Sequence, residues 1–213
     1  MRLTVLGATG GTGREIVRQG LEAGHEITAV VRDPAKLPVA HERLTVVRAD
    51  VFDAAALEPA VKGADAVLST LGHRSLGDDT PLCADAARAT IAAMRATECR
   101  RLLVVSAAPV SRNDPGDRRL YALTVRPILR YVLRRGYADM AVMEDRVRAA
   151  DDLEWTILRP PKLTDRPATG VARTALNQNV PGGYTLSRAD LAAELLRRVD
   201  DARSVRAAVG IGN

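Results

Sequence analysis

The chain has 213 residues, 46% of them hydrophobic, and a formal net charge of +5 at pH 7, so it is long enough to bury one sizeable core and we expect a single domain over 1–213. No apolar run reaches the roughly 18 residues that a membrane-spanning helix needs, and the first residues resemble a strand rather than a signal peptide. We therefore expect a cytoplasmic protein without membrane contact.

Taken in chain order, the elements alternate between strand and helix. Strands are predicted at 2–6, 27–32, 44–48, 65–70, 102–106 and 154–158, with a last short strand near 205–209. Helices are predicted at 12–23, 54–62, 80–97, a broken region over 118–150, and 187–199, where Ser187 and Asp190 form a capping pair. This order predicts a Rossmann-like, doubly wound α/β fold: a mainly parallel sheet with helices on both faces. Loops at 107–125 and 160–186 are expected to wall a pocket for a second substrate.

Three evenly spaced glycines, Gly7, Gly10 and Gly13, lie between the first strand and the first helix. A dinucleotide diphosphate needs close backbone approach and free N–H groups at the start of a helix. The spacing Gly-x-x-Gly-x-x-Gly differs from the standard Gly-x-Gly-x-x-Gly and alone is weak, but in this alternating chain it predicts a dinucleotide site. The expected set here is Gly7, Thr9, Gly10, Gly11, Thr12 and Gly13.

The residues at the end of the second predicted strand indicate which dinucleotide is bound. Arg32 stands where an arginine accommodates a ribose 2′-phosphate, and Arg14 and Lys36 add positive charge nearby. Asp33 is counter-evidence, since a carboxylate there can accept from a free 2′-hydroxyl, although an Asp-Pro pair more often begins a turn. NADP(H) is therefore predicted in preference to NAD(H).

Ligands of open parallel sheets lie over the carboxyl ends of the strands. Asp50 and Val51 follow the third predicted strand, and Leu71 and Gly72 follow the fourth. Asp50 and Gly72 are either adenine-side contacts or ordinary caps and turns, and the residues leave both readings open. At the ends of the fifth and sixth strands, Ser106 and Pro160 are expected to face the nicotinamide half.

Two other features of the sequence could have a function, but we interpret both as structural. Arg126, Arg130 and Arg134 recur every fourth residue, opposite an apolar face, so we favour the solvated side of an amphipathic helix over nucleic-acid contact. Cys83 and Cys99 have no paired spacing, which predicts packing residues and neither a disulfide framework nor a metal site.

The motifs GATGGTG, VVRD, Asp50-Val51, Leu71-Gly72 and RPPKLTDRP together resemble the atypical short-chain dehydrogenase/reductases with an NAD(P)H-binding domain, especially the biliverdin-IXβ (flavin) reductase group and its bacterial relatives. The resemblance runs along essentially the whole chain. It implies an NADPH-dependent reductase with a planar acceptor over the nicotinamide. The family's Leu-Gly-x-Arg segment falls on Leu71, Gly72 and Arg74, and its serine falls on Ser106. The histidine of the family's Pro-Pro-His segment is replaced by Lys162 in this chain. Two interpretations of Lys162 are equally supported: a catalytic or acceptor-binding residue, or a charge on the surface of a loop.

Classical short-chain dehydrogenases protonate an alkoxide with a Tyr-x-x-x-Lys pair. No tyrosine here has that lysine, since the pairs are Tyr121–Val125, Tyr131–Arg135, Tyr137–Ala141 and Tyr184–Arg188. Hydride transfer to a flavin, quinone or tetrapyrrole gives a delocalised anion that solvent can protonate, so the sequence favours a conjugated acceptor.

Two alternatives remain. A non-catalytic dinucleotide sensor similar to the NmrA-like regulators is the stronger one, although such regulators usually carry a longer C-terminal region. A sugar-nucleotide epimerase or dehydratase is disfavoured by the missing tyrosine pair and the lack of a substrate domain. The sequence leaves the oligomeric state and the identity of the acceptor open.

Overall fold

Strands and helices alternate along the chain, as predicted. The computed structural model describes residues 1–73, 81–111, 115, 124, 127 and 134–213. Its first half contains β1 (Arg2–Leu6), α1 (Gly11–Glu22), β2 (Glu26–Val31), η1 (Pro34–Lys36), β3 (Leu44–Arg48), α2 (Ala54–Val61), β4 (Ala66–Ser69), α3 (Leu82–Ala96), β5 (Arg101–Val105) and η2 (Ala108–Val110). The second half contains α6 (Arg134–Arg148), β6 (Glu154–Arg159), β7 (Lys162–Thr164), β8 (Arg173–Leu176), β9 (Thr185–Ser187), α7 (Arg188–Arg197), η3 (Ala202–Ser204) and β10 (Ala207–Gly212).

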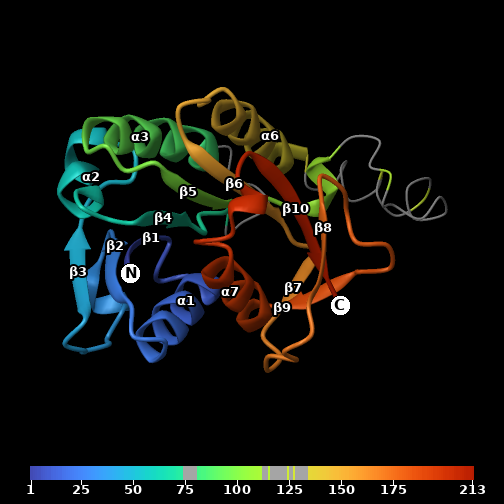
Figure 1. The fold of residues 1–213 in the computed structure, drawn as a ribbon, viewed down its shortest axis with the longest axis horizontal. Helices are drawn as coiled ribbons and strands as arrows, with labels where there is room; N and C mark the ends of the chain where they lie inside the picture. Colours follow the sequence, from blue (N-terminus) through green and yellow to red (C-terminus); the bar gives the residue numbers. More distant parts are fainter. Residues whose placement is uncertain (74–80, 112–114, 116–123, 125–126, 128–133) are drawn as a thin grey trace.

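The main sheet has the order β3-β2-β1-β4-β5-β6-β10-β8 (Figure 1). Strand pairs are parallel from β3 to β10, and β8 runs antiparallel to β10 at the edge. After β1 the chain builds outward through β2 and β3, and β4 then lies on the other side of β1. The sheet therefore reverses its winding between β1 and β4, the place where open α/β sheets bind their ligands.

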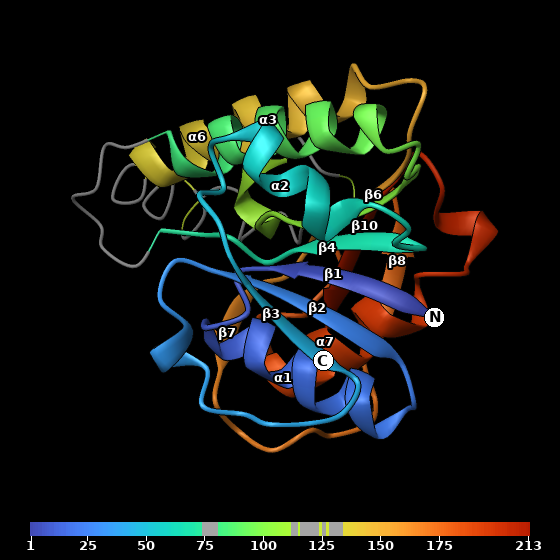
Figure 2. The ribbon, with the colours of Figure 1, turned by 90° about the vertical axis from the view of Figure 1, so that its left-hand side faces the viewer.

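Helices cover both faces of the sheet (Figure 2). Helices α2, α3 and α6 lie on one face, and α1 and α7 lie on the other. Each face has its own apolar core: Leu57, Met94 and Ile157 belong to the first, and Ile16 and Leu191 to the second, all fully buried. The Rossmann-like α/β architecture expected from the sequence is confirmed.

The region 160–186, predicted as loop, contains three short strands. β7 and β9 pair in parallel as a separate two-stranded sheet, and β8 joins the edge of the main sheet. Strands of three or four residues are too short to show a clear alternation of apolar and polar residues. In addition, β8 pairs with β10, which is distant in the sequence. Of the predicted loop 107–125, the structure describes 107–111, which includes η2, together with residues 115 and 124. Of the broken helical region 118–150, it describes α6 and little before it.

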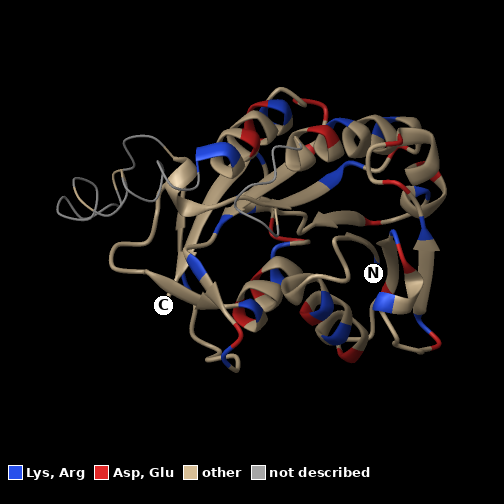
Figure 3. Cartoon of the chain, turned by 180° about the vertical axis from the view of Figure 1, so that it is seen from behind, with Lys and Arg blue, Asp and Glu red and all other residues tan. Residues whose placement is uncertain are grey.

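Charges of both signs occur along the described helices (Figure 3). In α1, Arg18 pairs with Glu15 and Glu22, and Arg146 of α6 pairs with Asp85 of α3. Of the predicted arginine stripe, Arg126 and Arg130 lie outside the described residues, and Arg134 begins α6. Within the described part of the chain, no helix combines the length and apolar character needed to cross a bilayer.

Candidate dinucleotide site

The glycine turn brings the start of α1 directly against the end of β1. Gly7 has a φ of +82°, a left-handed conformation that favours glycine, and its carbonyl oxygen accepts from the Gly10 N–H at 2.9 Å. At Gly13, a Cβ would lie only 2.2 Å from the Gly7 carbonyl oxygen. Gly13 therefore permits the close approach of the two backbones, and Gly7 permits the left-handed turn.

The amino terminus of α1 is open to an anion. Its N-cap residue, Gly10, makes no side-chain capping bond, and its first turn contains no acidic residue. The first N–H groups of a helix have no partner within the helix, and together with the helix dipole they favour negative charge. A diphosphate is the group that this arrangement suits.

A cleft of about 230 Å³ lies beside this turn, at the point where the sheet reverses its winding. Its walls come from the ends of β1, β2 and β4 and from the segment after β3. The lining residues are Gly7, Thr9, Gly10, Val30, Val31, Arg32, Val51, Phe52, Thr70, Leu71, Gly72 and Leu82. A second hollow of about 220 Å³ lies at the amino ends of the strands, next to Arg2, Glu26 and Lys62. We assign the first cleft as the site because ligands of parallel sheets bind at the carboxyl ends.

The structure brings together many of the residues that the sequence singles out. Gly7, Thr9, Gly10, Arg32, Val51, Leu71 and Gly72 all line the cleft, and Gly11, Thr12 and Gly13 continue the turn into α1. Asp50 is not part of this lining; it is exposed and accepts from the Phe52 N–H at 3.0 Å, a local turn. Arg74 lies outside the described residues.

At the end of β2, Arg32 and Asp33 have different roles. Arg32 is exposed and lines the cleft, and within the described part of the chain it has no ion-pair partner. Asp33 caps η1 by accepting from the Ala35 N–H at 3.1 Å and lies 3.8 Å from the Lys36 ammonium. Arg14 donates to the Lys36 carbonyl at 3.0 Å, which holds this loop against α1. The Asp33 carboxylate, which was the evidence for a free 2′-hydroxyl, thus forms its contacts within its own turn.

Ser106 follows β5 and is 3% exposed. Its N–H donates to the Leu158 carbonyl at 2.8 Å, while its hydroxyl oxygen is buried with no hydrogen-bond partner among the described residues. Nearby, the buried Pro160 accepts from the Ala108 N–H at 2.9 Å. An orphaned buried hydroxyl at the carboxyl end of a central strand is a group that a bound carboxamide or carbonyl would satisfy. Lys162, by contrast, is exposed at the start of β7.

Arg188 lies next to the candidate site, and sequence analysis did not identify it. A Cβ on Gly11 would lie 2.5 Å from the Arg188 Cδ, so the arginine stem crosses the first turn of α1. Its guanidinium pairs with the largely exposed Asp165 at 2.7 Å, a contact that an anion could replace. The capping pair Ser187–Asp190 indicates where α7 begins, but nothing in the sequence places that point beside Gly11. Phe52, Thr70 and Leu82 were also missed, since only the folded cleft brings them together.

Comparison with known proteins supports this assignment. A family profile described as NAD(P)H-binding matches residues 7–202. The chain is 28% identical over 210 residues to YwnB of Bacillus subtilis, an uncharacterized protein, covering 94% of this chain and 92% of YwnB. It is 28% identical over 158 residues to the (4-alkanoyl-5-oxo-2,5-dihydrofuran-3-yl)methyl phosphate reductase of Streptomyces griseus, covering 74% of this chain but only 46% of that reductase.

Solved structures share the fold over the whole chain. A short-chain dehydrogenase/reductase from Veillonella parvula, solved in complex with NADP, is 20% identical with a TM-score of 0.79, covering 100% of this chain and 94% of that one. SP1627 of Streptococcus pneumoniae, provisionally assigned as an NADH-flavin reductase, is 23% identical with a TM-score of 0.76, covering 100% and 99%. At these identities the likeness shows the fold alone.

Proposed function

Since this chain belongs to the NAD(P)H-binding family whose profile it matches over residues 7–202, we propose that it is an NADPH-dependent reductase that transfers hydride to a planar conjugated acceptor such as a flavin, quinone or tetrapyrrole. The observation that carries this proposal is the open glycine turn beside a cleft that includes Arg32. The similarity to the reductase of Streptomyces griseus adds support.

The residues of the chain would hold the cofactor along the cleft. The free N–H groups at the start of α1 would bind the diphosphate. Arg188, whose side chain lies over Gly11, would add a cationic contact to the same group. Arg32 would bind the ribose 2′-phosphate. Arg32 lines the cleft, whereas Asp33 caps η1 and lies 3.8 Å from the Lys36 ammonium, and this difference supports NADP(H) over NAD(H).

Bound NADPH would supply the hydride. The Ser106 hydroxyl would orient the nicotinamide carboxamide or an acceptor carbonyl, because it is buried at that end of the sheet without a described partner. Holding donor and acceptor in near-attack geometry is then the main contribution of the protein. Hydride transfer to a conjugated acceptor gives a delocalised anion, which solvent can protonate without a catalytic acid from the protein. This agrees with a chain that lacks the Tyr-x-x-x-Lys pair.

The test is NADPH oxidation followed at the cofactor absorbance band with FMN, dichlorophenolindophenol and biliverdin as acceptors. We expect turnover with at least one of them, and a loss of about tenfold or more in Ser106→Ala with little change in NADPH affinity. Lys162→Gln tests the second candidate: a higher KM for anionic acceptors alone would assign Lys162 to acceptor binding. Dinucleotide binding with no turnover across the panel would contradict the reductase and favour the sensor.

A further inference from the structure

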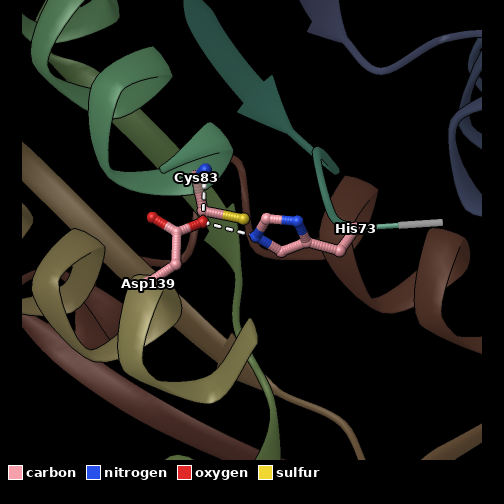
Figure 4. Close-up of side chains that lie close together, drawn as sticks. All are labelled: His73, Cys83 and Asp139. Carbon is pink, nitrogen blue, oxygen red and sulfur yellow. Dashed lines mark hydrogen bonds and ion pairs between the residues drawn. The ribbon is translucent and has the colours of Figure 1, made fainter. Parts of the chain in front are cut away.

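Three side chains with metal-binding atoms, those of His73, Cys83 and Asp139, lie close together (Figure 4). His73 follows β4, Cys83 lies in the first turn of α3, and Asp139 lies on α6. The His73 Nε2 and Asp139 Oδ2 atoms are 2.7 Å apart, and one imidazole nitrogen, the thiol sulfur and one carboxylate oxygen all lie within 4.8 Å of one another. In the sequence the three are widely and irregularly spaced, which is why no motif indicates them.

The cluster is buried. The His73 and Asp139 side chains are 8% and 7% exposed, and Cys83 is 2% exposed. Asp139 also accepts from two backbone N–H groups at the start of α3, those of Cys83 at 2.7 Å and Ala84 at 2.9 Å. These bonds fix the direction of the carboxylate, in the way that outer hydrogen bonds orient carboxylate ligands in metal sites.

The Cys83 thiol lies in an environment that a cation would change. Burial, and next the charge of Asp139, raise the pKa of this thiol far above its ordinary value. One thiolate and one carboxylate carry two negative charges, and a divalent cation with a neutral imidazole would make the buried cluster neutral.

We propose that His73, Cys83 and Asp139 form a binding site for a zinc ion. Sulfur, imidazole nitrogen and carboxylate oxygen are the donors that Zn²⁺ takes, whereas Mg²⁺ and Ca²⁺ take oxygen alone. Tetrahedral ligands at about 2.0 Å lie about 3.3 Å apart, so His73 and Asp139 need to separate by only about half an ångström. On binding, the ion would replace the proton on Sγ, which is released, and His73 would ligate through Nε2 as a neutral imidazole with its ring proton on Nδ1.

The position of the site gives it a structural role. It joins the segment after β4 to α3 and α6, and the residues just before His73, Leu71 and Gly72, line the cleft. A zinc ion would thus fix one wall of the cleft. Since the site uses none of the residues assigned to the dinucleotide, it stands or fails independently of the reductase function.

Cobalt(II) tests the site because a Co²⁺–thiolate bond produces a near-ultraviolet charge-transfer band that imidazole and carboxylate ligands do not. Purified protein is stripped with a chelator, titrated with Co²⁺, and then challenged with Zn²⁺. We expect the band to appear, to saturate near one ion per chain and to be removed by Zn²⁺. Cys83→Ser should abolish it. Cys99→Ser is the matched control, because Cys99 is a second buried thiol, 5% exposed, and the band should persist there.

Thermal unfolding gives a second readout. Zn²⁺ should raise the Tm of the wild type and of Cys99→Ser by several degrees, and leave Cys83→Ser unchanged. If Cys83→Ser does not fold, His73→Gln replaces it, since an amide can still donate to Asp139 but is a poor zinc ligand, and its Co²⁺ affinity should fall by at least about tenfold. Absence of the band in the wild type, or a band of full intensity in Cys83→Ser, overturns the proposal.

Discussion

At the residue scale, the proposed preference for NADP(H) depends on Arg32. Arg32 lines the cleft, is exposed, and has no ion-pair partner among the described residues. A charge-assisted hydrogen bond contributes about 1.5–3 kcal/mol, so we expect Arg32→Ser to weaken NADPH binding by about 10- to 100-fold while NADH binding changes little. Calorimetric titration of both cofactors measures this. Arg203→Ser, which removes an exposed arginine on η3, controls for net charge, and an equal loss for both cofactors would contradict the assignment.

Gly13 acts through shape alone. A Cβ at this position would lie 2.2 Å from the Gly7 carbonyl oxygen. That oxygen belongs to the backbone, which cannot easily move. We expect Gly13→Ala to lower the free energy of unfolding by about 1–3 kcal/mol and to disturb the turn. Gly72→Ala is the matched control, because its Cβ would meet only the Met140 Cε, at 4.0 Å. Urea unfolding compares the two, and equal stability in both variants would refute the packing argument.

At the scale of the element, the Asp190 carboxylate ties the loop at 169–170 to the first turn of α7. Its carboxylate accepts from the Ser187 hydroxyl at 2.8 Å and from the Thr169 and Gly170 N–H groups, each at 3.0 Å. Burial tends to raise the pKa of Asp190, but these hydrogen bonds outweigh it and hold the pKa below its ordinary value of 3.8. The start of α7 in turn positions Arg188 over the glycine turn.

A carboxyl group with a depressed folded-state pKa stabilises the protein above its unfolded pKa, and that contribution is lost as the pH falls through the folded pKa. We therefore expect Asp190→Asn to cost about 1–3 kcal/mol near neutral pH. The gap to the wild type should close as the pH falls below about 3.8. Unfolding in urea across this pH range measures the gap, and a gap independent of pH would show that Asp190 acts by shape rather than by charge.

At the scale of the whole molecule, cofactor binding and stability are linked. The cleft is built from the ends of strands that belong to both cores, so a ligand that binds only the folded chain must stabilise all of it. At a concentration of about 100 times Kd the gain is about 2.7 kcal/mol, which for a chain of this size is a rise in Tm of about 5–10 °C. Differential scanning calorimetry should show this rise with NADPH and a smaller one with equimolar NADH. Equal rises would contradict the preference for NADP(H).

The features that the sequence determined are those set by local patterns. Apolar runs and helical periodicity placed the alternating elements, because they depend on neighbouring residues alone. The glycine spacing indicated the turn, because a close backbone approach restricts residue type at each position. Ser187 and Asp190 marked the start of α7 for the same reason, as the capping contacts between them confirm.

Only the tertiary structure decided which distant segments meet. It placed Arg188 over Gly11, separated Arg32 in the cleft from Asp33 in its own turn, and paired β8 with β10. It also gathered His73 and Asp139 on one point, although they lie 66 residues apart. Such contacts follow from how helices pack on the sheet and from where strand ends converge, and no pattern in a single stretch of chain encodes them.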